Sequence, residues 1–583
     1  MSRAARLLPL VLLWLLHGEV FAGPLLDVSL KGLEGELKEN ALAWLGAPPE
    51  TAQERLIYVV SIERNLERSL QALGYYDPDI EVDIRRTEPV WQARVTVNPG
   101  DPVRIRHVSV QFQGGVREDE AFDQLLSDVP FTQGDVLHHG QFETFRRKVL
   151  ALGLRRGYFD GVLTLSRVEV EPVAGTADIF LHYDSGERYL FGKLDYDHEQ
   201  IMGTLLEPLR TFSAGDYYDQ AKLQQFQSSL QRTGYFSSVL VRPETEMAEN
   251  TIVPISLELF PAERHRFNVG VGFSTDTEER VSVTWRTPRV NRYGHRQETR
   301  LQYSRVNPSG RFTYTIPLKH PLDDVLQLSA RLEDNEFGDL NSLQQELGVR
   351  RETSRGGWLR GLSLRGLNES WRVLGEDREN SYLLPGVSLS RKDRRGSAVN
   401  PSGGFGQVYQ LEAGGENLGS DIDLVRATAN FRVISTPWTP HRFVGKLDLG
   451  AVFLSDGDED ELAPSLAYFA GGSQSIRGYG YQSIGNEITV TDEKRNERNL
   501  VVGGTRLLVA SLEYQYAFSD TWRGALFVDG GDAFDEGNFD MNVGAGFGIH
   551  YVTAVGAIRL DIANPVTDDD PKWRFHLAVG AEF

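Results

Sequence analysis

The chain has 583 residues, enough for several domains, and its 40% hydrophobic and 10% aromatic content excludes disorder throughout. A formal net charge of −21 argues against nucleic-acid binding, which requires a concentrated basic surface. The absence of cysteine excludes disulfides and thiol catalysis, and it weakens any proposal of a thiolate zinc site.

The first 22 residues have the pattern of a secretory signal peptide. Arg3 and Arg6 precede the apolar run Leu7 to Leu16, and the segment closes on the small residue Ala22. An anchoring helix is the alternative, but the run is too short to span a bilayer. Because only helices and closed barrels satisfy every backbone group in lipid, we expect an exported protein that is either soluble or inserted as a barrel.

A short motif occurs three times in the first half, each time after a helical pattern and before a strand pattern. The three copies are Gly74-Tyr75, Gly157-Tyr158 and Gly234-Tyr235. Before the second copy, Phe142, Phe145 and Val149 recur at helical spacing. The glycine is therefore predicted to end each helix, and alternating residues begin the next strand.

The surroundings of the motif predict three units, each ordered strand–helix–helix–strand–strand: residues 23–100, 101–185 and 186–263. This unit resembles the polypeptide-transport-associated (POTRA) domain. Unrelated α+β domains are the alternative, but three copies of one motif in one local context argue against them. A small three-stranded sheet leaves a free edge, to which an extended client segment can add as another strand.

From residue 264 the helical period gives way to alternation of period two. Val281, Val283 and Trp285 are apolar, for example, while the residues between them are polar. Charged residues on one face and aromatic residues on the other are typical of outer-membrane barrels. We predict that residues 264–583 form a transmembrane antiparallel β-barrel of about 16 strands, with a soluble β-sandwich as the alternative.

The last predicted strand carries the clearest alternation. Its apolar face consists of Trp573, Phe575, Leu577, Val579, Ala581 and Phe583. A terminal aromatic residue on an amphipathic strand resembles the sorting signal of outer-membrane barrels. Together with the signal peptide, it predicts a protein of the outer membrane of a Gram-negative bacterium, with the three repeats in the periplasm.

A glycine-rich segment near the end of the chain contains the run Ile476, Arg477, Gly478 and Tyr479. An arginine cannot shed its charge, so a buried one requires carboxylates, whereas in a surface loop it would be solvated. Strand alternation turns Glu513 and Asp529 to the inner wall, where their carboxylates would be available to such an arginine. Asp561 also falls on an inward face and is interpreted as ordinary lumen polarity.

The predicted first barrel strand spans residues 266–275. It contains Phe267, Val269, Gly270, Val271, Gly272 and Phe273, and the last strand contains Gly580. Glycines weaken strand packing and register, although they are also common in barrels. The glycine-rich run 544–548 is no dinucleotide motif, because it lies within a strand pattern.

Three POTRA-like units before a barrel, with Ser475-Ile476-Arg477-Gly478-Tyr479 in a late loop, resemble the BamA/TamA superfamily of outer-membrane insertases. Three units are most similar to the TamA group. The resemblance implies a sixth loop folded into the barrel, and on this basis we predict that Arg477 pairs with Asp529 and also with Glu513 on the inner wall. It also implies a seam between the first and last strands that opens and templates client strands without a chemical step. This seam would include Phe267, Val269, Gly270, Val271, Gly272, Phe273 and Gly580, and its glycines suit such opening. Because no chemical step is implied, we expect no enzymatic activity, cofactor or metal.

The resemblance also implies partners: client outer-membrane proteins and autotransporters, outer-membrane lipid, and a TamB-like protein anchored in the inner membrane. Two other functions remain open. One is a two-partner secretion pore for a soluble exoprotein, and the other is the outer-membrane component of a lipid-transport bridge.

Overall fold

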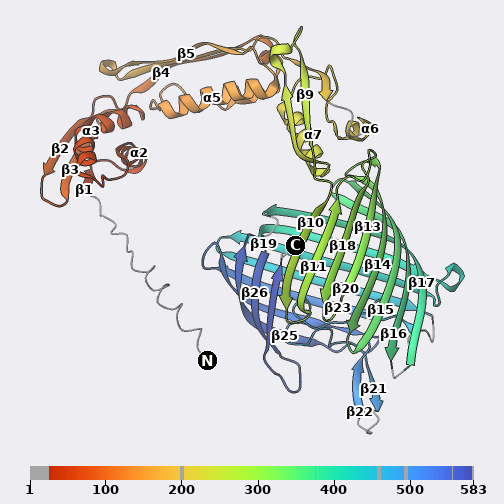
Figure 1. The fold of residues 1–583 in the computed structure, drawn as a ribbon. Coiled ribbons are helices and arrows are strands. Elements are labelled where there is room, and N and C mark those ends of the chain that lie inside the picture. The colour runs from red at the N-terminus through yellow and green to blue at the C-terminus, as the bar shows by residue number, and fades with distance from the viewer. Residues whose placement is uncertain are drawn as a thin grey trace, which may run out of the picture. The chain divides into compact units, whose positions relative to one another are not determined.

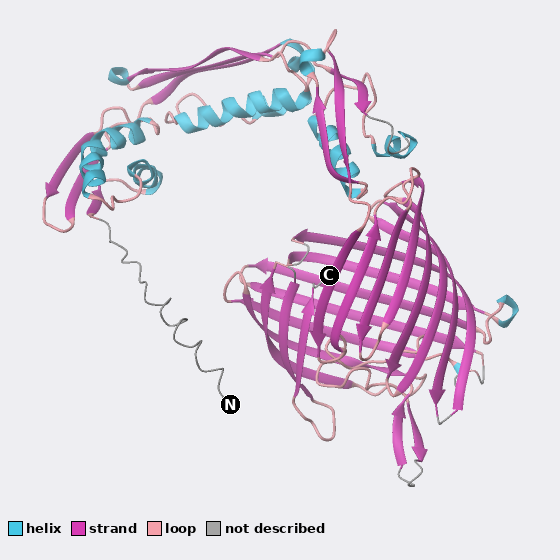
Figure 2. Cartoon of the chain, in the orientation of Figure 1, coloured by secondary structure: helices cyan, strands magenta, loops and turns pink. Residues whose placement is uncertain are grey.

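The computed structural model describes residues 25–196, 203–373, 376–397, 400–455, 458, 461–491, 497–554 and 556–580. The predicted signal peptide and two residues of the predicted sorting signal, Ala581 and Phe583, lie outside the described residues. Three small α+β units precede a large antiparallel sheet (Figures 1 and 2). None of the helices in the described ranges combines the length and apolar character needed to cross a bilayer.

The first unit has a three-stranded sheet in the order β1-β3-β2. Its elements are β1 (Leu26–Lys31), α2 (Gly35–Leu45), α3 (Ala52–Gln71), β2 (Asp79–Arg85) and β3 (Trp91–Asn98). Helix α3 begins at a capping box, in which Thr51 and Glu54 each bond the other's backbone amide. Ile62, Leu66 and Leu70 recur at helical spacing and are fully buried in the core formed with β3.

The second and third units repeat this order, with sheets β4-β6-β5 and β7-β9-β8. The second consists of β4 (Arg104–Gln113), α4 (Glu120–Ser127), α5 (His139–Arg156), β5 (Val162–Glu171) and β6 (Thr176–Asp184). The third consists of β7 (Leu190–Tyr196), α6 (Gly203–Leu206), α7 (Gln220–Arg232), β8 (Phe236–Pro243) and β9 (Ile252–Pro261). The predicted strand–helix–helix–strand–strand unit is confirmed.

The glycine–tyrosine motif has a second role beyond ending a helix. Gly74, Gly157 and Gly234 all adopt left-handed φ values, of 92°, 87° and 72°. The carbonyl of Gly74 accepts a hydrogen bond from Val103 N–H at 2.8 Å, and that of Gly157 accepts one from Tyr189 N–H at 2.9 Å. Each bond joins one unit to the next. Tyr158 and Tyr235 are buried, while Tyr75 is half-buried.

A partly buried cluster of ion pairs reinforces the joint between the second and third units. Arg156 bonds Asp119 at 2.9 Å within its own unit and Asp219 of the third unit at 3.2 Å. Burial raises the pKa of Asp119, but the Arg156 hydrogen bond and the Ala121 amide outweigh it and hold that pKa below its usual range. Burial, with the charge of Asp119, raises the pKa of Tyr158 to about 12. The joint is therefore a defined contact and not a free linker.

The barrel is a 16-stranded sheet whose strands follow chain order from β10 to β27, so the predicted strand number is confirmed. The strands are β10 (Arg266–Ser274), β11 (Glu278–Thr287), β12 (Arg296–Ser304), β13 (Ser309–His320), β14 (Asp324–Phe337), β15 (Leu340–Arg355), β16 (Trp358–Val373), β17 (Glu376–Gly396), β18 (Pro401–Gly414), β19 (Leu424–Trp438), β20 (His441–Leu454), β23 (Arg506–Ala517), β24 (Trp522–Phe534), β25 (Asn542–Thr553), β26 (Gly556–Pro565) and β27 (Arg574–Gly580). The hairpin β21 (Glu487–Thr491)–β22 (Glu497–Val501) lies outside this sheet.

Alternation of period two separates the outer face of the barrel from its lumen. On β10, Phe267, Val269 and Val271 are 66%, 71% and 82% exposed, as expected for residues that face lipid. On β27, Phe575 and Val579 are exposed in the same way, whereas His576 between them is buried. Polar and charged side chains of the alternate set therefore form the inner wall.

Candidate functional site

Residues 461–484 belong to the connection between β20 and β23 and pack inside the barrel; this segment is called here the internal loop. Its residues Ala463, Leu466 and Ile476 are almost fully buried. They belong to one apolar cluster with wall residues such as Leu384 of β17 and Val509 of β23. The internal loop thus occupies part of the barrel lumen, as the glycine-rich segment and the family resemblance predicted.

Arg477 of the internal loop is 6% exposed and faces carboxylates of three strands. Its Nε and Nη2 donate to the two oxygens of Asp529 on β24, at 2.7 and 2.9 Å. Its Nη1 donates to Glu513 of β23 at 2.7 Å and to Asp561 of β26 at 3.2 Å. Asp529 and Glu513 are the partners named from strand alternation. The interpretation of Asp561 as ordinary lumen polarity was wrong. We call these four residues the Arg477 latch.

Each carboxylate of the latch is also held by a neighbouring side chain. Ser511 Oγ donates to Asp529 Oδ1 at 2.6 Å, and Gln515 Nε2 donates to Glu513 Oε1 at 2.6 Å. His550 Nε2 lies 3.0 Å from Asp561 Oδ1. Removal of the guanidinium would leave three buried acidic groups without their shared cation, which is costly in a low-dielectric site. The wall is therefore organised to receive one arginine.

An aromatic ring and three glycines shape the space around the latch. The Phe527 ring centroid lies 3.4 Å from Arg477 Cζ, within cation–π range. A Cβ on Gly544 would lie 1.8 Å from Arg477 O, and one on Gly548 would lie 1.9 Å from Asp561 Oδ1. Gly546 likewise has no room for a Cβ, which would lie 2.1 Å from Ile562 O. Gly544 therefore lets the loop backbone approach the wall, while Gly546 and Gly548 leave room for neighbouring groups of β26. The sequence showed them as a glycine run but did not assign this role.

The seam lies between β10 and β27, the two ends of the sheet order. Thr275 N–H, just after β10, donates to Leu577 O at 3.2 Å, and Leu577 N–H donates to Thr275 Oγ1 at 3.4 Å. On its other side, β27 pairs with β26 in continuous register from Ala557↔Gly580 to Ala563↔Arg574. Gly270 and Gly272 lie in β10, and Gly580 ends β27, so the predicted seam glycines lie in the two end strands.

The internal loop contacts both sides of the seam. Ser473 N–H and Oγ donate to Asp276 Oδ2 at 2.9 and 2.5 Å, and Asp276 lies in the turn between β10 and β11. Gly478 N–H donates to His576 Nε2 of β27 at 3.0 Å. Sequence reasoning missed both contacts. The segment that carries Arg477 therefore bridges the two end strands.

Three α+β units followed by a 16-stranded antiparallel barrel, with an arginine-bearing loop inside it, define an outer-membrane barrel protein with periplasmic POTRA domains. Residues 262–583 match the Omp85 superfamily domain, and the chain belongs to this superfamily. Residues 27–99 match the first POTRA domain of TamA. The predicted location in the outer membrane of a Gram-negative bacterium, with the POTRA domains in the periplasm, is confirmed.

Two known proteins illustrate the similarity. The outer membrane protein assembly factor BamA of Nitratidesulfovibrio vulgaris is 25% identical over 394 residues, which cover 63% of this chain and 48% of that protein. The match thus spans about half the length of that relative. The crystal structure of Haemophilus ducreyi BamA lacking POTRA domains 1–3 covers 95% of this chain and 99% of its own, with a TM-score of 0.58 and 14% identity. This second similarity shows the fold alone.

Proposed function

We propose that the protein is an outer-membrane insertase that helps client β-barrel proteins and autotransporters to insert and fold. The observation that carries this proposal is the seam, where the described ends of β10 and β27 meet through Thr275 and Leu577. The similarity to BamA of Nitratidesulfovibrio vulgaris, an outer membrane protein assembly factor, supports it. The superfamily membership supports it as well.

In this proposal the seam works by strand addition. Separation of β10 from β27 exposes a row of unpaired backbone N–H and C=O groups, on which a client strand can pair. The exposed apolar side chains of β10, such as Val269 and Val271, already face lipid, so a client strand would enter directly into the bilayer. Strand addition makes and breaks no covalent bond. We therefore propose that the protein is not an enzyme and uses neither cofactor nor metal.

The Arg477 latch has a positioning role in this mechanism. It fixes the internal loop to β23, β24 and β26 through charge-assisted bonds, while the same loop touches the turn after β10 and the middle of β27. We propose that the loop keeps the seam in register between rounds of client insertion. Loss of the latch would leave the strands in place but let the seam lose its alignment.

Within the superfamily we propose that the protein belongs to the TamA group. Its support is the match of residues 27–99 to the first TamA POTRA domain, together with three POTRA units. This assignment implies a TamB-like partner anchored in the inner membrane. A photo-crosslinker in place of Val60, which is 83% exposed on α3 of the first unit, should capture such a partner. Absence of this product, with clients still captured from Val579 on β27, would contradict the TamA assignment alone.

A reversible crosslink across the seam tests the insertase proposal. The chain has no cysteine, so a Thr275→Cys/Leu577→Cys variant carries a single possible disulfide. We expect oxidation to abolish client insertion into lipid vesicles and reduction to restore it. The matched control is Ile558→Cys/Val579→Cys, which joins register partners of the continuous β26–β27 pair and should leave insertion unchanged. Insertion at the normal rate by the oxidised seam variant would contradict the proposal.

A further inference from the structure

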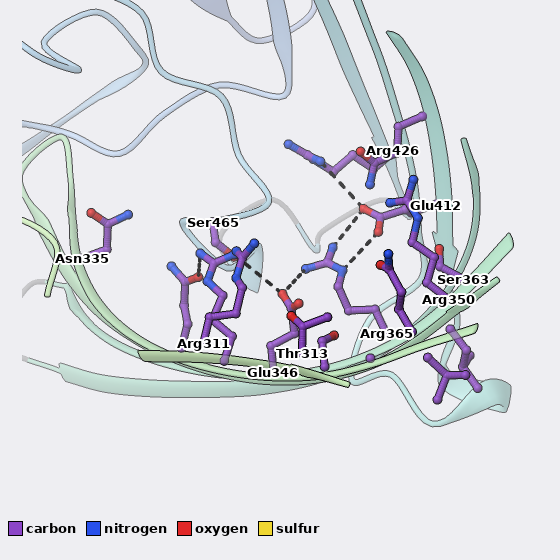
Figure 3. Close-up of a pocket in the computed structure, with 18 of the residues that line it drawn as sticks. Arg311, Thr313, Asn335, Glu346, Arg350, Ser363, Arg365, Glu412, Arg426 and Ser465 are labelled. Carbon is purple, nitrogen blue, oxygen red and sulfur yellow. Dashed lines mark hydrogen bonds and ion pairs between the residues drawn. The ribbon is translucent and has the colours of Figure 1, made fainter. Parts of the chain in front are cut away.

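A second polar site lies on the inner wall, away from the latch residues. It is a cavity of about 520 Å³ lined by β13 to β16, β18, β19 and Ser465 of the internal loop (Figure 3). Five arginines line it: Arg311, Arg331, Arg350, Arg365 and Arg426. Two glutamates, Glu346 and Glu412, line it with them. In a chain with a formal charge of −21, this local excess of cations is unexpected.

Most of these arginines share carboxylates. Arg365 lies between Glu346, at 3.4 Å, and Glu412, at 2.9 Å, as Figure 3 shows. Arg426 lies 3.8 Å from the same Glu412. Outside the lining set, Glu333 contacts Arg331 at 2.5 Å, and Glu352 contacts Arg350 at 2.9 Å. Four of the five guanidinium groups are thus at least partly neutralised by the protein.

Arg311 is different. It lies directly opposite Arg300 in the β12–β13 pair and directly opposite Arg331 in the β13–β14 pair. Like charges in opposite positions of neighbouring strands destabilise a sheet. Arg311 is exposed, and within the described ranges no hydrogen bond or ion pair engages its guanidinium. Arg300 donates to the amide of Gln302 at 3.3 Å, which brings no negative charge. Arg311 is therefore the middle residue of a row of three arginines, and it has no acidic partner within the described ranges.

We propose that this cavity binds a phosphate-bearing anion, with Arg311 and Arg331 as its principal ligands. A guanidinium presents a planar fork of donors that matches phosphate oxygens, and such bonds are stronger than neutral ones. Thr313 and Ser329, which flank the row on the same inner face, add hydroxyl donors. The volume is that of a small-molecule site. The phosphate can belong to a soluble compound or to a phospholipid headgroup, and the site is independent of the insertase proposal.

Titration of the purified full-length protein in detergent micelles tests the site. Inorganic pyrophosphate is one probe, and short-chain phosphatidylglycerol, with phosphatidylcholine as its zwitterionic control, is the other. We expect saturable calorimetric binding of at least one probe and about a tenfold loss of affinity in Arg311→Gln. Because Arg311 has no partner in the described part of the chain, this change should leave the barrel folded.

Arg305→Gln is the matched control. It removes the same charge from the turn after β12, where Arg305 pairs with Glu278 at 2.8 Å and lies outside the cavity lining. Its affinity should equal that of the wild type. Pyrophosphate binding points to a soluble phosphate compound, and binding of phosphatidylglycerol alone points to a lipid headgroup. No saturable binding of either probe, unchanged affinity in Arg311→Gln, or tighter Arg311-dependent binding of citrate or a polyglutamate peptide would overturn the proposal.

Discussion

The latch and the seam belong to the same sheet but are held in opposite ways. At the latch, one arginine contacts three carboxylates from three strands, and each carboxylate is fixed by a further side chain. At the seam, the end strands meet through Thr275 and Leu577, and the loop adds bonds to Asp276 and His576. The loop is therefore anchored more firmly to β23, β24 and β26 of the wall than to β10 and β27, the two end strands that it bridges.

This asymmetry has an energetic consequence. The two Ser473 bonds to the Asp276 carboxylate contribute about 1.5–3 kcal/mol each, and the neutral seam bonds contribute about 1 kcal/mol each. Disruption of a buried ion pair, as at the latch, costs about 3–5 kcal/mol. Seam opening can therefore proceed with the loop still fixed to β23, β24 and β26. If the loop were instead released while the seam stayed closed, the more costly ion pairs of the latch would have to break first.

The largest expected effect comes from Arg477→Ala. It leaves Glu513, Asp529 and Asp561 buried without their cation and should destabilise the packed loop by about 3–5 kcal/mol. We expect the loop to become sensitive to protease and client insertion to fall, while the barrel keeps its compact form on unheated gels. Arg477→Lys keeps the charge but loses the fork and should be intermediate. Wild-type protection and activity in the alanine variant would refute the latch.

A smaller effect is expected from a methyl group in the wall. In Gly544→Ala the new Cβ would lie 1.8 Å from Arg477 O, so the loop backbone must move, at a cost of about 1–3 kcal/mol. The control is Gly530→Ala on neighbouring β24, whose Cβ would lie no closer than 3.6 Å to Asn542 O. Limited proteolysis should separate the two variants. Equal protection of the loop in both would show that β25 does not set its position.

Asp276→Ala tests the loop's hold on the seam. It removes the acceptor of both Ser473 bonds but leaves every latch contact in place. We expect faster hydrogen–deuterium exchange at Thr275 and Leu577, by about tenfold, with unchanged exchange along β23 and β24. If exchange rises at the latch strands as well, the two regions are not separable in the way proposed.

Tyr479→Phe should have the smallest effect. The Tyr479 hydroxyl lies 2.9 Å from Thr567 Oγ1, so the change removes one neutral hydrogen bond between the loop and the turn after β26. A loss of about 1 kcal/mol in loop stability is expected, measurable as a modest rise in protease cleavage. Client insertion should stay normal. A loss as large as that of Arg477→Ala would show that the charge network is not the dominant anchor.

Strand alternation was sufficient to predict much of the latch. Period two fixes which side chains share a face, so Glu513 and Asp529 could be placed on the inner wall from their neighbours alone. Alternation does not reveal how far a loop reaches or which wall residues lie at the same height. Asp561 was therefore misjudged, and the Ser473–Asp276 contact, which joins residues 197 positions apart, gave no local signal.

The contacts that join the POTRA units were not predicted from the sequence, and they determine how force passes from one unit to the next. A Cβ on Gly74 would lie 2.3 Å from Leu137 O, and one on Gly157 would lie 2.7 Å from Tyr218 Cβ, so each glycine seats the following unit directly. The backbone bond and the close packing at each joint oppose rotation of one unit against the next. A pull on the first unit would therefore be passed to the second as rotation as well as tension.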